Sequence, residues 1–452
     1  MSAFPRVALG LLMFLLPAAW SSAAPLRIAT FDVDATPPLG SPCAYRLAER
    51  ILDPLHCRGI VLLTDQKPIV LCAVDWLGIG NGGYDAWREA LAQAAGTTSE
   101  RVAVHVLHQH DSPRCDFTVE RLLSAQGLAG RFMDAPFAQR VIAQAAQALR
   151  KAIEHPRPVT HIGLGQAKVE KVASNRRILG PDGKVKYVRY SSCRLPEAIA
   201  APEGTIDPNL KIIALYDGRR PLALLSYYAT HPQSYYGQGD VSADFVGLAR
   251  TERDRALPGV LNLHFNGAGG NIAAGKYNDG SKQNRPVLVE RMARGMKAAF
   301  DHLERAPISS ADVEWRVRRV RLPVRDTLNE TNLRARLEDA SLDYNQRMMA
   351  AMSLAFVRRA AAGHQTELSC LRLGNAYVLH MPGELFVEYQ LAAQKMRPQS
   401  FVALAAYGDY AASYIGTAIA YGQGGYETGP GASRTAPEVE SVLMSAIGEL
   451  LK

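Results

Sequence analysis

Side chains that can bind a metal ion or transfer a proton follow several apolar stretches of this sequence. The residues concerned are His108, His110, His231 and Glu384. Two histidines and a carboxylate are a common protein ligand set for a catalytic zinc ion. Taken alone, the HxH pattern of His108 and His110 is weak support for a metal, because two loop histidines that only form hydrogen bonds can have the same spacing.

His231 and Glu384 each have a purely structural interpretation as well. His231 precedes Pro232, which favours an extended backbone, and it also fits a hydrogen-bonded core histidine. Glu384 follows a Pro-Gly pair and is expected to open a helix, where the helix dipole favours a carboxylate. The glycine-rich segment 266–271 matches neither the dinucleotide-binding fingerprint nor the P-loop. We expect its glycines to allow close approach of the backbone to a ligand.

The elements that must position these residues alternate between two periodicities. Apolar runs that predict strands lie at 58–63, 68–74, 102–107, 211–216, 222–228, 260–265, 368–373, 376–381 and 401–406. Amphipathic patterns that predict helices lie at 84–95, 134–154, 244–256, 287–304, 330–362 and 384–397. The segment 314–325 alternates Val and Leu with Arg, which predicts a strand with one solvated face.

This order of elements predicts an α/β fold, with α+β as the alternative, in which layered sheets are flanked by helices. The polar residues follow the strands, so we expect the site at the carboxyl ends of the strands, where α/β sheets place ligands. The chain has no evident internal repeat and no linker that divides it. A single large domain is therefore the simplest interpretation.

Composition excludes several classes of protein. The chain has 452 residues, of which 48% are hydrophobic and 21% charged, so it can bury a large core and is not a disordered protein. Lys and Arg exceed Asp and Glu by 8, but the excess is spread along the chain without a basic block. No nucleic-acid partner is therefore expected.

Residues 1–23 have the features of a cleavable secretory signal. One positive charge precedes the apolar run Val7–Trp20, and small residues follow it. We expect a mature chain that starts near Ala24 and is secreted or periplasmic. Export makes disulfides permissible. Cys43 and Cys57 are the preferred pair, with free buried cysteines as an equal alternative.

Several motifs, in order along the chain, resemble those of the catalytic domain of the neutral, non-lysosomal ceramidases. Asp34–Gly40 (DATPPLG) resembles the opening DITPPxG of that family, and His108–Pro113 (HQHDSP) resembles its HTHSGPG. The other matching segments are Asn175–Arg176, Ala229–Pro232, Gly269–Ile272, Met381–Glu384, and Tyr414, Tyr421 and Tyr426–Glu427. The resemblance covers nearly the whole mature chain, so residues 24–452 are expected to form a ceramidase-like catalytic domain.

The resemblance implies a zinc-dependent amidohydrolase that cleaves the N-acyl bond of a lipid or small-molecule amide such as ceramide. The zinc ligands that it implies are His108, His231, Glu384 and Tyr414. It also implies catalytic roles for His110, Arg176 and Tyr426. Zinc would lower the pKa of a bound water to about 7. His110 would carry the proton to the leaving amine, while Arg176 and Tyr426 would donate hydrogen bonds to the oxyanion.

Three features depart from that family. Ala273 stands where the family has a serine near the metal, and Asp111 and Arg114 replace smaller residues in the histidine motif. We expect no immunoglobulin-like C-terminal domain of the kind that the family carries after the tyrosine-rich region. Two alternatives to a ceramidase therefore stay open: the same metal core acting on another amide or ester, and a non-catalytic ligand-binding relative. Peripheral contact with a membrane and the oligomeric state are left open too.

Overall fold

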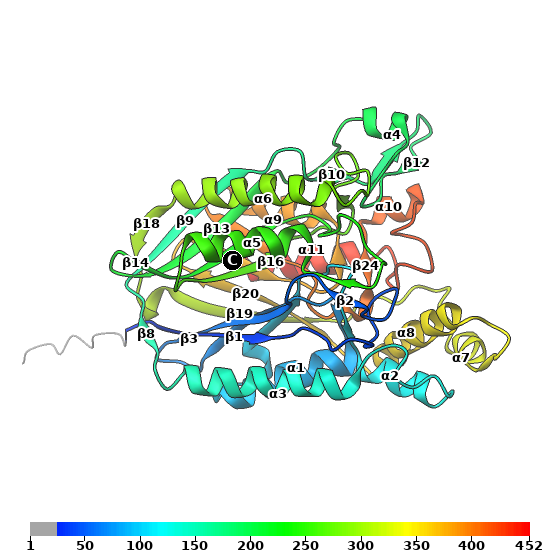
Figure 1. Cartoon of the computed structure of the whole chain (residues 1–452), viewed down its shortest axis with the longest axis horizontal. Coiled ribbons are helices and arrows are strands. Elements are labelled where there is room, and N and C mark those ends of the chain that lie inside the picture. Colours follow the sequence, from blue (N-terminus) through cyan, green and yellow to red (C-terminus); the bar gives the residue numbers. More distant parts are fainter. Residues whose placement is uncertain (1–24) are drawn as a thin grey trace, which may run out of the picture.

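The computed structural model describes residues 25–452, and the predicted signal segment lies outside the described residues. It confirms a mixed α/β fold in which several sheets are flanked by helices (Figure 1). Among the helices of the described part, none has both the length and the apolar character needed to cross a bilayer.

Three large sheets share one strand order. The first contains β1 (Arg27–Asp34), β3 (His56–Leu63), β4 (Ile69–Val74) and β6 (Val102–Val106). The second contains β9 (His161–Lys168), β13 (Asn209–Asp217), β14 (Arg220–Tyr228) and β16 (Leu261–Asn266). The third contains β19 (Val313–Val320), β20 (Thr366–Leu373), β21 (Ala376–His380) and β23 (Phe401–Ala405). In each sheet the first three strands pair antiparallel, and the fourth pairs parallel with the third.

Helices complete the same pattern three times. The crossover helix of each parallel pair is α1 (Asn81–Ala95), α5 (Asp244–Ala256) or α9 (Val387–Met396). A second helix follows each fourth strand, namely α3 (Ala135–Ala152), α6 (Asn284–Asp301) and α11 (Val439–Leu450). The chain is therefore built from three βββαβα modules, which we call module 1 (27–152), module 2 (161–301) and module 3 (313–450).

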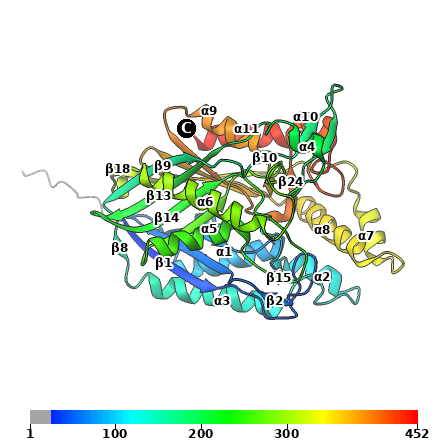
Figure 2. The same ribbon diagram turned by 45° about the horizontal axis from the view of Figure 1, so that its top comes forward.

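This repeat corrects the expectation that the chain has none. It lies in the order and direction of the elements, and insertions of different length conceal it in the sequence. Module 1 carries the extra helix α2 (Phe117–Ser124), whereas module 3 carries the helical hairpin α7 (Glu330–Glu338) and α8 (Tyr344–Ala361). In Figures 1 and 2 this hairpin projects from the body of the molecule.

The three sheets pack against one another around a common core. Leu71, Leu225 and Val378, each from the third strand of a module, lie in one buried apolar cluster. The outer faces of the sheets are covered by the helices, with α1 and α3 on one side and α5 and α6 on another (Figure 1). Figure 2 separates α9 and α11 on a third side. Strands that are covered on both faces appear in sequence as continuous apolar runs, which explains why the central strands were predicted correctly.

The carboxyl ends of the three fourth strands are joined by a closed ring of hydrogen bonds. The Val106 amide donates to the Tyr407 carbonyl over 3.1 Å, and the Ala406 amide donates to the Asn266 carbonyl over 2.9 Å. The Asn266 side-chain amide closes the ring by donating to the Leu107 carbonyl over 3.1 Å. The loops that follow these strands consequently meet at one place.

Some predicted elements differ from the observed ones. The predicted helix 330–362 is interrupted, because Asp343 caps a new helix and forms a capping box with Gln346. Glu384 does not open a helix: it lies on the short strand β22 (Glu384–Leu385), and α9 begins at Val387. The predicted strand at 314–325 is β19, which ends at Val320. The first strands of modules 1 and 2, and α11, were not predicted.

The six cysteines, all within residues 25–452, are unpaired. The predicted Cys43–Cys57 bridge is not formed, because Cys57 lies on β3 beside Cys72 of β4, with the two sulfurs 3.5 Å apart. Burial raises the pKa of the Cys57 thiol well above its usual range. The alternative of free cysteines is the one that the structure adopts.

Candidate metal centre

Three buried ligand-type side chains converge where the modules meet. His108 follows the fourth strand of module 1, whereas His231 and Glu384 follow the third strands of modules 2 and 3. Their ligand atoms all lie within 4.8 Å of one another. Glu384 Oε2 is 2.9 Å from His231 Nε2 and 3.3 Å from His108 Nε2. The expected position of the site at the carboxyl ends of strands agrees with this arrangement.

Hydrogen bonds to backbone carbonyls fix how both imidazoles are turned. His108 Nδ1 lies 2.7 Å from the Leu77 carbonyl oxygen, and His231 Nδ1 lies 2.7 Å from that of Gly269. A carbonyl only accepts, so each Nδ1 carries a proton, and the Nε2 of each ring is the nitrogen whose lone pair a bound metal ion would use. This is the outer-sphere arrangement that metal-binding histidines usually have. The donor set therefore fits a metal ion.

The carboxylate is held ionised in this pocket. Burial alone would raise the pKa of Glu384, but the contacts with His108 and His231 lower it well below its usual range. Tyr410, which the sequence interpretation did not single out, donates its hydroxyl to Glu384 Oε1 over 2.6 Å. This bond leaves Oε2 directed at the two histidines.

The Tyr414 hydroxyl reaches the same place. Tyr414 lies on β24 (Tyr414–Ile415), which pairs in parallel with β22 so that Tyr414 stands opposite Glu384. Its hydroxyl is 3.2 Å from His231 Nε2 and accepts a hydrogen bond from Arg176 over 3.1 Å. The four residues that the resemblance implies as ligands thus lie together.

Arg176 is a buried cation beside the ligand cluster. It follows β10 (Ser174–Asn175), and its Nε lies 3.1 Å from Glu427 Oε1. Burial would lower the pKa of Arg176, but Tyr414 and Glu427 raise it above its usual value, so the guanidinium stays charged. Glu427 is fully buried, and its role as counter-ion was not predicted.

Tyr426 lies farther out than the other predicted site residues. Its side chain is half-exposed, and its ring packs edge-on against Tyr414 with centroids 5.7 Å apart. It also packs edge-on against the ring of Tyr190 at 5.9 Å. Tyr426 therefore stands at the mouth of the site rather than within the ligand cluster.

His110 lies next to the cluster without belonging to it. Its Nε2 is 3.4 Å from His108 Nε2, and its Nδ1 is 2.7 Å from the hydroxyl of Tyr45. Burial, together with the nearby His108 and His231, lowers the pKa of His110 well below its usual value. The imidazole is therefore neutral near pH 7 and can accept a proton.

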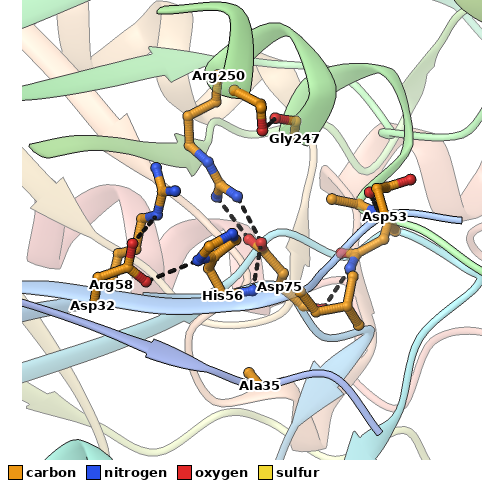
Figure 3. A network of polar contacts seen from close by, with 12 residues as sticks. Asp32, Ala35, Asp53, His56, Arg58, Asp75, Gly247 and Arg250 are labelled. Carbon is orange, nitrogen blue, oxygen red and sulfur yellow. Dashed lines mark hydrogen bonds and ion pairs between the residues drawn. The ribbon is translucent and has the colours of Figure 1, made fainter. Parts of the chain in front are cut away.

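A buried ion pair supports the His108 segment. Arg250 of α5 donates to both carboxylate oxygens of Asp75, over 2.7 and 2.6 Å (Figure 3). Burial would raise the pKa of Asp75, but Arg250 lowers it below its usual value, so the pair stays ionised. The Asp75 carbonyl accepts from the Gln109 side chain, and the Trp76 carbonyl accepts from the His108 amide over 2.9 Å. Module 2 thus buttresses the segment of module 1 that carries His108.

The glycine-rich segment serves the site in a different way from the one expected. A side chain at Gly270 would overlap the backbone carbonyl of Glu384, so the close approach is between two segments of the chain rather than to a ligand. Ala273 is fully buried on β17 (Ile272–Ala273). Its carbonyl accepts a hydrogen bond from the Ser174 hydroxyl over 2.9 Å.

Comparison with known proteins places this fold. No family model matches the chain, and no curated protein sequence matches it. A solved structure described as a ceramidase complexed with C2 is similar at 15% sequence identity and a TM-score of 0.70, over 94% of this chain and 75% of that one. The neutral ceramidase of Pseudomonas aeruginosa is similar at 16% identity and a TM-score of 0.70, over 94% and 74%. The chain therefore has the neutral ceramidase fold, and the resemblance drawn from its motifs is confirmed at the level of the fold.

Proposed function

We propose that this protein is a zinc-dependent hydrolase that cleaves the amide bond of an N-acyl substrate of the ceramide type. The observation that carries the proposal is the convergence of His108, His231, Glu384 and Tyr414 beside the charged Arg176. The donor set of two imidazoles and a carboxylate is typical of catalytic zinc, and the fold is shared with ceramidases.

The four converging side chains would hold the ion. Zinc, when bound, supplies Lewis-acid chemistry and activates water toward a carbonyl carbon. Because both Nδ1 atoms are committed to carbonyl oxygens, the two histidines are pre-oriented with Nε2 toward the centre. Little reorganisation of the protein is then required on binding.

The remaining site residues would stabilise the negative charge of the intermediate and transfer the proton released by water. Water adds to the amide carbonyl carbon, and the carbonyl oxygen gains negative charge that Arg176 and Tyr426 can stabilise by donating hydrogen bonds. His110 takes the proton released by the water on its Nε2. It returns that proton to the amide nitrogen as the carbon–nitrogen bond breaks, so the products are a carboxylic acid and an amine.

Ala273 bears on the choice of substrate. It lacks the hydroxyl found at this position in the ceramidases that the sequence resembles. We therefore propose that amide hydrolysis persists while long-chain ceramide is a poorer substrate. Ala273→Ser would then raise ceramide turnover. Efficient ceramide cleavage by the unaltered protein, unchanged by the serine, would show that Ala273 does not shape specificity.

The test is hydrolysis of ceramide and of a panel of short N-acyl amides and esters by the purified protein, before and after chelation and on return of zinc. Amide cleavage that is lost on chelation and restored by zinc supports the proposal. Cleavage of esters alone would reassign the substrate, and zinc binding without any turnover would identify a ligand-binding relative. A protein that neither contains zinc nor takes it up would overturn the proposal.

His110→Ala separates proton transfer from metal binding. General acid–base groups contribute about 10²–10⁴-fold, so the variant should lose that much turnover while keeping its zinc. His155→Ala, at an exposed histidine, is the matched control. Near-normal turnover by His110→Ala would show that His110 is only structural.

We further propose that residues 1–23 direct export and that residues 24–452 are the catalytic unit. This proposal is supported by the order of residue types at the start of the chain, in which a positive charge is followed by an apolar run and then by small residues. N-terminal sequencing of protein recovered from outside the cytoplasm would find a start near Ala24. A retained Met1 in such a fraction would contradict cleavage.

A further inference from the structure

Tyr45, which contacts His110, belongs to a loop that none of the sequence motifs includes. Tyr45 stands in the segment between β1 and β3, and its hydroxyl oxygen is 2.7 Å from His110 Nδ1. We propose that Tyr45 is a positioning residue whose hydroxyl oxygen accepts a hydrogen bond from Nδ1–H of His110 and thereby favours the tautomer in which Nε2 is unprotonated and directed at the candidate metal centre. This inference rests on the proposed function for its consequence in catalysis, although the contact itself does not.

The loop holds Tyr45 in place by its backbone. The Ala44 amide donates to the Ser112 carbonyl over 3.2 Å, and the Arg114 side chain donates to the Ala44 carbonyl over 3.0 Å. Tyr45 also lies within a tight turn, closed by a hydrogen bond of 2.9 Å from the Cys43 amide to the Arg46 carbonyl. The residue is therefore fastened to the segment that directly follows His110.

Aromatic packing restrains the same pair of rings. The ring of Tyr236 stacks on that of Tyr45 with centroids 5.1 Å apart, and it also lies 5.1 Å from the imidazole of His110. The Tyr45 and His110 centroids are 5.5 Å apart. The three centroids lie within 5.5 Å of one another, so the two tyrosines pack together against one side of the imidazole and restrain its rotation there.

The proposed role of His110 as a base determines which of its nitrogens carries the proton. His110 Nε2 faces His108 Nε2 at 3.4 Å, so Nε2 is the nitrogen that points to the reacting groups. A base needs a lone pair there, and in neutral imidazole the other nitrogen then bears the hydrogen. The phenolic oxygen of Tyr45 can accept a hydrogen bond from that N–H group. In catalytic triads a third group holds the histidine tautomer in the same way.

Tyr45→Phe tests this proposal, because it retains the ring and removes the acceptor. We expect kcat to fall by about 10- to 100-fold, less than for loss of the base itself, with KM unchanged. Tyr187→Phe, on the β12 strand (Val185–Val188), is the matched control for removal of a tyrosine hydroxyl. An unchanged kcat, or a change in KM alone, would overturn the positioning role.

The tautomer can be read without any substrate. In ¹⁵N-histidine-labelled, zinc-loaded protein, with the signals of His110 assigned by comparison with His110→Ala, we expect Nδ1 to be protonated and Nε2 to be unprotonated. In Tyr45→Phe we expect the population to shift toward the Nε2–H tautomer. A wild-type Nε2–H tautomer, or an identical tautomer in both proteins, would refute the proposal. If no N-acyl substrate is turned over, the proposed function fails, and this readout still decides the role of Tyr45.

Discussion

The imidazole of His108 stacks on the ring of Tyr407, with centroids 4.6 Å apart and 27° between the planes. β6 ends at Val106 and β23 at Ala405, so each residue stands two places beyond the fourth strand of its module. Both have left-handed backbones, with φ of 70° and 60°. A non-glycine residue held in that region costs of order 1–3 kcal/mol. Modules 1 and 3 therefore use the same strained turn, once for a candidate ligand and once for the ring that stacks on it.

Tyr407→Leu is expected to weaken zinc binding by about 10- to 100-fold, because His108 loses the surface that restrains its ring. Leucine meets the same backbone strain as tyrosine, so the comparison isolates the ring. Tyr407→Phe is the control, since the Tyr407 hydroxyl has no hydrogen-bond partner among the described residues. Zinc affinity would be measured by competition with a chromogenic chelator. Equal affinities for the leucine variant and the wild type would contradict a supporting role of Tyr407.

Removal of the metal is expected to lower the thermal stability of the protein. The candidate ligands come from three modules, so an ion held by them would bind the folded chain and not the unfolded one. At free zinc about 100 times Kd, the gain in stability is about 2.7 kcal/mol. Calorimetry should show this gain for the wild type and for His155→Ala, and no gain for His231→Ala. A zinc-dependent Tm in His231→Ala would exclude His231 as a ligand.

Breaking the Asp75–Arg250 pair is expected to destabilise the fold. Arg250→Met leaves a fully buried carboxylate without its partner, which typically costs about 3–5 kcal/mol. The double variant Asp75→Leu with Arg250→Met removes both charges and should recover part of that loss. Urea unfolding of the two variants measures the difference. If both are equally destabilised, the unpaired charge is not the cause.

Stability is expected to fall as the pH drops below neutrality, because buried histidines must become charged on unfolding. Burial lowers the pKa of His105 from 6.5 to about 4 and that of His264 from 6.5 to about 3. The unfolded chain therefore binds more protons in this range. The stability that each neutral histidine contributes is complete above pH 6.5 and is lost as the pH falls toward the folded-state pKa. Each contributes a slope of about 1.4 kcal/mol per pH unit.

His105→Gln provides the test of that slope. Urea unfolding would be measured between about pH 4 and pH 6.5, the pKa values of His105 in the folded and unfolded chain. In this range the free energy of unfolding of the variant should depend on pH less steeply than that of the wild type, by about 1.4 kcal/mol per pH unit. His302→Gln, at an exposed position, should leave the slope unchanged. An unaltered slope in His105→Gln would mean that His105 is already protonated in the folded protein.

The sequence predicted the central strands because covering on both faces leaves continuous apolar runs, and it predicted the crossover helices from their amphipathic patterns. It did not reveal β1, whose residues Arg27–Asp34 mix apolar and charged side chains. It also missed the break before α8, although Asp343 and Gln346 are spaced as a capping box and could have indicated it. The modular repeat is invisible without coordinates, because direction and pairing of strands carry it.

The residues of the candidate site differ in how well the sequence alone could identify them. His108, His231 and Glu384 could be selected from residue type and position after strands, whereas Tyr414 came from the resemblance alone. Tyr410 and Tyr45 were missed, since a tyrosine in a loop has no periodic signal and its partner is set by tertiary packing. Glu384 was expected to begin a helix because the helical pattern 384–397 starts there. The pairing of β22 with β24 overrides that local preference.

The spread of the ligands along the chain has a consequence for biosynthesis. The candidate ligands extend from His108 to Tyr414, and modules 1, 2 and 3 each contribute at least one. A nascent polypeptide emerging from the ribosome has the complete set only after residue 414 has been added. Partial chains that end before Glu384 offer only a His–His pair, and those that end before Tyr414 lack the fourth candidate ligand. Metal capture would then act as a late checkpoint, reached only when all three strand ends have docked.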